Sequence, residues 1–223
     1  RPLSVEHMLA AIETAEAGRA VLEGAVGAGT GTVCFGFKGG IGTSSRRLPD
    51  DIGGYTFGVL VQANYGGELQ VMGLPVGRML ADNISPKDDG DGSIMIIVAT
   101  DAPLSDRNLS RLAWRTFGGL ARTGSSLSNG SGDYALAFST AESVRRTPGR
   151  RKNIAQFSEL PNDLMSPLFQ AVIEATEEAI YNALFIATDM SGFKGRNVRA
   201  LPVDRVLKML HDLQLRRDAD ENR

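Results

Sequence analysis

Histidine and cysteine, on which many hydrolase and metal sites depend, are scarce in this sequence. Its 223 residues include one cysteine, Cys34, which excludes an internal disulfide and a thiolate metal site and is interpreted as a buried core residue. The two histidines, His7 and His211, lie near opposite ends of the chain, with no histidine or carboxylate at ligand spacing. We therefore expect no metal, no cofactor and no Ser-His-Asp triad.

An excess of positive charge and a long apolar run are also missing. The net charge is -2, which gives no electrostatic basis for binding nucleic acid or an anionic membrane. The one basic run, RRTPGRRK (145–152), contains Pro and Gly and indicates a solvated loop more than a phosphate site. The apolar run near Ile94 is too short to cross a bilayer, and no signal peptide is visible at a start that lacks Met. A cytoplasmic location is expected.

Helical and strand patterns occur in mixed order along the chain. This order predicts an α/β (α+β) fold with helices packed on both sides of sheets. The segment 93–101 is apolar and β-branched throughout, which predicts a strand buried on both faces. Helices are expected over 4–20, 104–123, 161–188 and 202–216, and strands over 55–66, 69–77, 93–101 and 134–143, with a strand–turn–strand unit in FGFKGGIGTSSR (35–46).

Polar residues stand at the ends of three of these apolar strands. Asn64 closes one strand, Ser93 opens another, and Ser131 and Asp133 precede a third. Each of them alone is typical of a turn or a capping residue. Together they supply a nucleophile, an amide donor for an oxyanion and a hydroxyl–carboxylate pair, which favours a hydrolase.

Such a serine needs a base, and no histidine or Ser-x-x-Lys pair is placed to provide one. The amine of a chain terminus is a known alternative, and its unperturbed pKa of about 7.7–8.0 suits catalysis near neutral pH. Ser93 would acquire this amine if the Gly92–Ser93 bond were cut. The polar stretch DDGDG (88–92) makes that bond accessible, and Gly92 can adopt backbone angles closed to other residues. We therefore predict self-cleavage between Gly92 and Ser93.

Several longer segments resemble one known family of peptidases. The chain resembles the DmpA-type peptidases, the P1 family of L-aminopeptidase/D-amidase/D-esterase and β-peptidyl aminopeptidases, from about residue 20 to 210. The segments that carry this resemblance are GAVGAGTGTVCFGFKGGIGTSSR, YTFGVLVQANYG, GDGSIMIIVATDAPL, LARTGSS, SGDYALAFST and EEAIYNAL.

The resemblance implies a self-processing hydrolase of the N-terminal-nucleophile type. The fold would be a four-layer αββα sandwich in a single catalytic domain over 1–223. After self-cleavage, 1–92 would be the C-terminal part of an α chain and 93–223 the β chain, and the two chains would stay together. About twenty residues precede the GAVGAGTGT segment, so we expect the family's N-terminal portion, with an aromatic hydroxyl near the nucleophile, to be absent from this sequence.

The resemblance also assigns the roles at the site. Ser93 matches the nucleophile, Ser131 and Asp133 the hydroxyl and carboxylate pair, and Asn64 the amide of the oxyanion site. The implied activity is that of a serine aminopeptidase/amidase acting on small peptides, amino-acid amides or esters through an acyl-enzyme on Ser93.

Two other functions stay open at this point. The chain could be an inactive or scaffold homologue of the same fold, or it could transfer acyl groups like the ornithine acetyltransferases, whose nucleophile is a threonine. The apolar surface of the two C-terminal helices, 161–188 and 202–216, exceeds what one layer needs, so a homo-oligomer is expected.

Overall fold

The computed structural model describes residues 3–15, 18, 20–83 and 92–221, and side chains as far as 215. Gly92 and Ser93 are therefore included. Most of the polar stretch before them, DDGD (88–91), lies outside the described residues.

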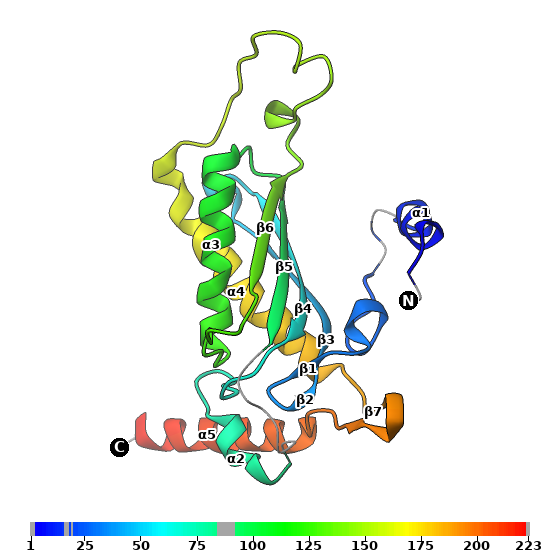
Figure 1. Ribbon diagram of the computed structural model, residues 1–223. Coiled ribbons are helices and arrows are strands. Elements are labelled where there is room, and N and C mark those ends of the chain that lie inside the picture. Colours follow the sequence, from blue (N-terminus) through cyan, green and yellow to red (C-terminus); the bar gives the residue numbers. More distant parts are fainter. Residues whose placement is uncertain (1–2, 16–17, 19, 84–91, 222–223) are drawn as a thin grey trace.

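One four-stranded sheet forms the centre of the fold (Figure 1). Its strands lie in the order β3-β4-β5-β6; neighbours pair antiparallel except β5 and β6, which are parallel. A parallel pair needs a crossover, and helix α3 provides it here. The strands are β3 (Gly40–Arg47), β4 (Thr56–Asn64), β5 (Ser93–Thr100) and β6 (Tyr134–Ser139), with two short antiparallel pairs, β1 (Val33–Cys34) with β2 (Phe37–Lys38) and β7 (Met190–Ser191) with β8 (Asn197–Val198).

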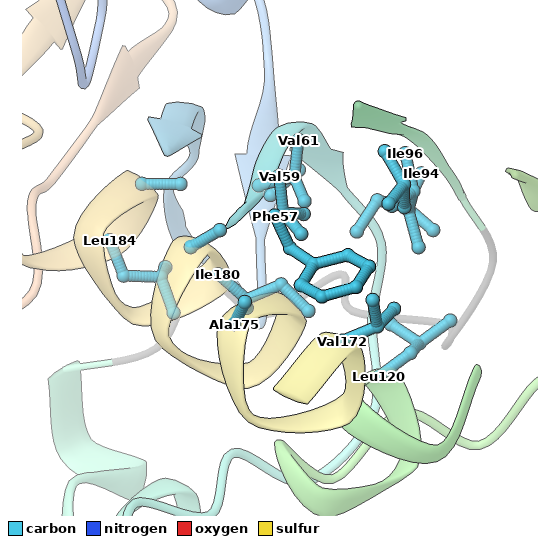
Figure 2. Packing of buried hydrophobic residues seen from close by; sticks show 14 of the residues in the cluster. Phe57, Val59, Val61, Ile94, Ile96, Leu120, Val172, Ala175, Ile180 and Leu184 are labelled. Atoms are coloured by element: carbon cyan, nitrogen blue, oxygen red, sulfur yellow. The ribbon is translucent and has the colours of Figure 1, made fainter. Parts of the chain in front are cut away.

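Two long helices cover one face of this sheet. Helix α4 packs against β3 and β4, and α3 packs against β6 and against α4. Phe57 and Val59 of β4 and Ile96 of β5 point toward Val172 of α4 and Leu120 of α3 (Figure 2). The helices are α1 (Val5–Glu13), α2 (Val76–Met79), α3 (Asp106–Arg122), α4 (Met165–Phe185) and α5 (Val203–Glu221).

The second face of the sheet is mostly accessible to solvent. Ile94, Ile96 and Val98 of β5 are fully buried under the helices, while Met95 between them is 44% exposed and Leu136 on β6 is 56% exposed. The prediction that this strand is buried on both faces is therefore wrong, because only the face toward the helices is fully buried. The α/β class is confirmed, and the described residues supply one β layer and one α layer of the four expected.

Most of the predicted elements are present, and the exceptions have local causes. The expected strand over 69–77 is a turn closed by the Val71–Leu74 bridge, because Gly73 has a φ of 79° and Pro75 has no N–H for a ladder. The helix expected over 4–20 ends at Glu13, and none of its residues is buried. The helices expected over 104–123, 161–188 and 202–216 are α3, α4 and α5.

The remaining structural expectations concern single features. Cys34 is buried, as predicted. Residues 145–152 form an exposed loop between β6 and α4, as expected of a solvated basic run. Within the described ranges, no helix is both long and apolar enough to cross a membrane.

Candidate active site

The pairing of the central strands brings the predicted site residues to one end of the sheet. Asn64, the last residue of β4, lies opposite Ser93, the first residue of β5. Strand β6 starts beside Met95 and runs parallel to β5, so the residues just before it, Ser131 to Asp133, lie next to Ser93. The sheet register alone therefore gathers residues that are up to 69 positions apart, between Asn64 and Asp133.

The Ser93 hydroxyl lies against the peptide bond that precedes it. Its Oγ donates a hydrogen bond to the Gly92 carbonyl oxygen at 2.7 Å and accepts one from the Gly132 N–H at 3.2 Å. The same Gly132 N–H is 3.1 Å from the Gly92 carbonyl oxygen. One backbone donor thus serves both the hydroxyl oxygen and the adjacent carbonyl oxygen.

Only glycine fits at position 92. Its φ is 153°, in the region that L side chains rarely adopt. A Cβ there would lie 2.6 Å from the Tyr65 Cα and closer still to the Asn64 carbonyl oxygen. The turn into β5 therefore brings the two backbones too close together for any side chain at this position.

Asp133 and Ser131 hold the backbone that follows Ser93. The Asp133 Oδ1 accepts hydrogen bonds from the Ile94 N–H at 3.2 Å and from the Ser131 hydroxyl at 2.7 Å. Ser131 contacts Asp133, Asp133 contacts β5, and the group that contacts Ser93 Oγ is the N–H of Gly132 between them. Sequence reasoning missed this donor because a backbone N–H has no side-chain signature, and the position of Gly132 between two site residues was the only signal.

The Asn64 side chain is oriented by the neighbouring β1 strand. Its Oδ1 accepts a hydrogen bond from the Val33 N–H at 3.0 Å. Because a backbone N–H can only donate, this bond assigns the oxygen and leaves the Nδ2 amide as a donor. Asn64 can thus present two N–H donors at the end of the sheet where Ser93 starts.

Tyr65 supports this end of the sheet from within the core. Its hydroxyl hydrogen-bonds the Thr123 hydroxyl at 2.9 Å, and its ring packs edge-on against Phe35 with centroids 4.9 Å apart. Burial raises the pKa of Tyr65 well above its ordinary value, so the phenol is neutral across the physiological range. It serves as a packed neutral anchor beside Asn64.

A metal centre is not found in the parts of the chain that the structure covers. No group of three or more His, Cys, Asp or Glu side chains in these parts is arranged to hold a metal ion.

Comparison with known proteins identifies close relatives of this chain. It is 44% identical over 213 residues to the beta-peptidyl aminopeptidase BapA of Sphingosinicella microcystinivorans, covering 88% of this chain and 53% of the relative. A second BapA, from Sphingosinicella xenopeptidilytica, is 37% identical over 222 residues and is covered to 55%. The chain thus spans about half the length of the curated relatives it matches.

Solved structures agree with this relationship. The beta-aminopeptidase of a Burkholderia species superposes with a TM-score of 0.82 at 42% identity, over 95% of this chain and 59% of that one. The L-aminopeptidase D-Ala-esterase/amidase of Ochrobactrum anthropi, described as a variant of the Ntn hydrolase fold, superposes with a TM-score of 0.85 at 34% identity, over 96% and 58%. The predicted N-terminal-nucleophile-hydrolase-like fold is confirmed.

The model of Peptidase family S58 matches residues 1–198, which include every site residue described above. The chain belongs to Peptidase family S58.

Proposed function

We propose that this chain carries the self-cleavage site and the active centre of a serine aminopeptidase. The enzyme would remove N-terminal residues from small peptides, amino-acid amides or esters through an acyl-enzyme on Ser93. The observation that carries the proposal is the contact of Ser93 Oγ with the Gly92 carbonyl, with the Gly132 N–H bound to both. Membership of the peptidase family and the aminopeptidase relatives agree with it.

The first reaction is cleavage of the chain by its own serine. Ser93 Oγ adds to the Gly92 carbonyl carbon, and the negative charge that develops on the oxygen is met by the Gly132 N–H, 3.1 Å away. The C–N bond then breaks as the nitrogen takes up a proton, which leaves an ester between Gly92 and Ser93 Oγ. Water hydrolyses this ester, giving a carboxylate on Gly92 and a free amine and hydroxyl on Ser93.

The second reaction uses the newly freed amine as the base. It takes the proton of Ser93 Oγ as the oxygen attacks the substrate carbonyl, and it later gives that proton to the leaving amine. Asp133, bound to the Ile94 N–H, places a negative charge near the amine when it becomes protonated. Asn64 Nδ2 donates to the tetrahedral oxyanion, a contact whose loss typically costs about 2.7–4 kcal/mol in the transition state. Water then releases the acyl group from Ser93.

The two halves of the cleaved chain would remain one domain. Strand β4 of 1–92 pairs with β5 of 93–223 along its length, from Phe57 opposite Thr100 to Asn64 opposite Ser93. The core in Figure 2 likewise joins β4 to α3 and α4, which follow the cut. A homo-oligomer and a cytoplasmic location stay predictions from the sequence.

The test is an intact-mass spectrum of the purified protein, together with hydrolysis of an aminoacyl p-nitroanilide. Wild-type protein is expected to give two fragments divided at Gly92–Ser93 and to hydrolyse the anilide. Ser93→Ala should stay a single inactive chain, and Ser110→Ala, at an exposed serine of α3, should behave like wild type.

Other outcomes separate the alternatives. A wild-type chain that remains intact and still hydrolyses the anilide would exclude the terminal-amine mechanism. A folded, cleaved and inactive protein would favour the scaffold, and acetyl transfer from acetylornithine to glutamate would favour the acyltransferase.

A further inference from the structure

Lys38 is the only charged residue that is almost fully buried among those the structure describes. It is 1% exposed, and no carboxylate in the described regions lies within ion-pair distance of its ammonium. Its Nζ donates instead to three backbone carbonyls, those of Gly29 at 2.7 Å, Thr32 at 2.8 Å and Gly39 at 2.7 Å. These three carbonyls match the three N–H donors of an ammonium group, and the Thr32 Oγ1 is a fourth, longer contact at 3.4 Å.

Burying this ammonium without a counter-charge is costly. Burial disfavours the charged form of Lys38, and this desolvation lowers the pKa of its ammonium. An apolar side chain of similar length would fill the same volume without this cost. The hydrogen bonds of Lys38 point to a role in holding this backbone.

The carbonyls that Lys38 binds belong to the loop that orients Asn64. Thr32 directly precedes Val33, whose N–H fixes the Asn64 Oδ1 at 3.0 Å. The Gly39 N–H donates to the Thr32 carbonyl at 3.2 Å, which closes the loop around the ammonium. Gly39 also packs directly on β4, since a Cβ there would collide with the carbonyl of Ala63, the residue before Asn64.

We infer that Lys38 is a positioning residue for Asn64: it fixes the Val33 N–H that holds Asn64 Oδ1 and thereby directs Nδ2 toward the oxyanion formed at Ser93. The inference rests on the proposed role of Asn64. Without the ammonium, Thr32 keeps its direct hydrogen bonds to Gly29 and Gly39 but loses the shared donor that holds the three carbonyl groups together next to Val33. The amide can then rotate and present its oxygen to the oxyanion, which is repulsive.

The test is a double-mutant cycle on kcat for an aminoacyl p-nitroanilide. Lys38→Met keeps the length of the side chain and removes the ammonium, and it is expected to lower kcat about 10- to 100-fold while KM changes less than about twofold. In an Asn64→Ala background the same change should have less than about a threefold effect, because the amide it positions is gone. Equal effects in both backgrounds would show a merely structural role and overturn the inference.

Two further variants keep the test decisive. Lys194→Met, at a lysine that the structure places at an exposed turn, is the matched control and should leave kcat unchanged. If Lys38→Met does not fold, Lys38→Gln replaces it in the same cycle, since its neutral amide can still donate to two of the three carbonyls.

A second readout needs no enzymatic activity. The Asn64 side-chain N–H₂ pair can be assigned in a ¹⁵N NMR spectrum of the full chain by its loss in Asn64→Ala. In the variant at Lys38 this pair is expected to shift and to exchange faster with water, and an unchanged pair would overturn the inference even in an active enzyme. If wild-type protein hydrolyses nothing yet the pair responds, the proposed function fails while the link from Lys38 to Asn64 stands.

Discussion

Replacing Gly92 with alanine tests whether self-cleavage depends on the close approach of the two backbones before Ser93. The new Cβ would lie 2.6 Å from the Tyr65 Cα and closer still to the Asn64 carbonyl oxygen, whereas ordinary van der Waals contacts begin at 3.4 Å, so a shift of at least about 0.8 Å is required. The atoms that this Cβ would meet belong to the backbone of Asn64, the last residue of β4, and of Tyr65, which follows it. Strand β4 is hydrogen-bonded to a neighbouring strand on both sides. Gly92 itself must therefore move.

The magnitude follows from two costs. Placing a non-glycine residue at a φ of 153° costs about 1–3 kcal/mol, and overpacking costs about 1–3 kcal/mol more. We expect the free energy of unfolding to fall by about 2–6 kcal/mol in total. A displacement near 1 Å between Ser93 Oγ and the Gly92 carbonyl should slow self-cleavage about 100-fold.

Two measurements check this prediction. The cleavage rate is followed by intact-mass spectrometry after expression at low temperature, and stability is measured by urea unfolding in a Ser93→Ala background, where every chain is intact. Gly149→Ala is the control, since a Cβ there meets nothing within 4 Å and its φ is ordinary. Wild-type cleavage together with a loss of stability below about 0.5 kcal/mol in Gly92→Ala would refute the reasoning.

Three further substitutions test the helix layer and the site. Gly42→Ala should lower the unfolding free energy by at least about 1–3 kcal/mol, because its Cβ would lie 2.6 Å from the Ala183 nitrogen of α4. The control Gly58→Ala, on the open face of the sheet, should cost nothing, because a Cβ there meets no atom within 4 Å. Equal losses of stability in urea unfolding of the two variants would contradict this packing. Asp133→Asn keeps an oxygen for the Ile94 N–H but loses the charge, so kcat should fall about 10- to 100-fold with little change in thermal stability; an unchanged kcat would exclude a role for the carboxylate. Tyr65→Phe should cost about 0.5–1.5 kcal/mol in urea unfolding, since one buried hydrogen bond is lost, and a much larger loss would mean that the hydroxyl does more than bond Thr123.

Local patterns in the sequence were enough to locate most elements and to nominate the site. The 3.6-residue periodicity of 104–123 and 161–188 predicted α3 and α4, because an amphipathic stripe is needed wherever a helix covers a sheet. The scarcity of histidine left Ser93 without a base and so led to the Gly92–Ser93 bond. The strand expected over 69–77 does not form, because Gly73 and Pro75 turn the chain there despite its apolar content.

The tertiary structure decided the features that depend on contacts between distant parts of the chain. The composition of β5 is equally apolar on both faces, so the layer packed against the strand decides which face is covered. The donor to Ser93 Oγ is a backbone N–H at Gly132, and the orientation of Asn64 is set by Val33, 31 residues away. The buried ammonium of Lys38 likewise binds carbonyls that no side-chain pattern marks. A sequence displays side chains, whereas backbone donors and acceptors are the same at nearly every position and acquire a role only when the fold brings them together.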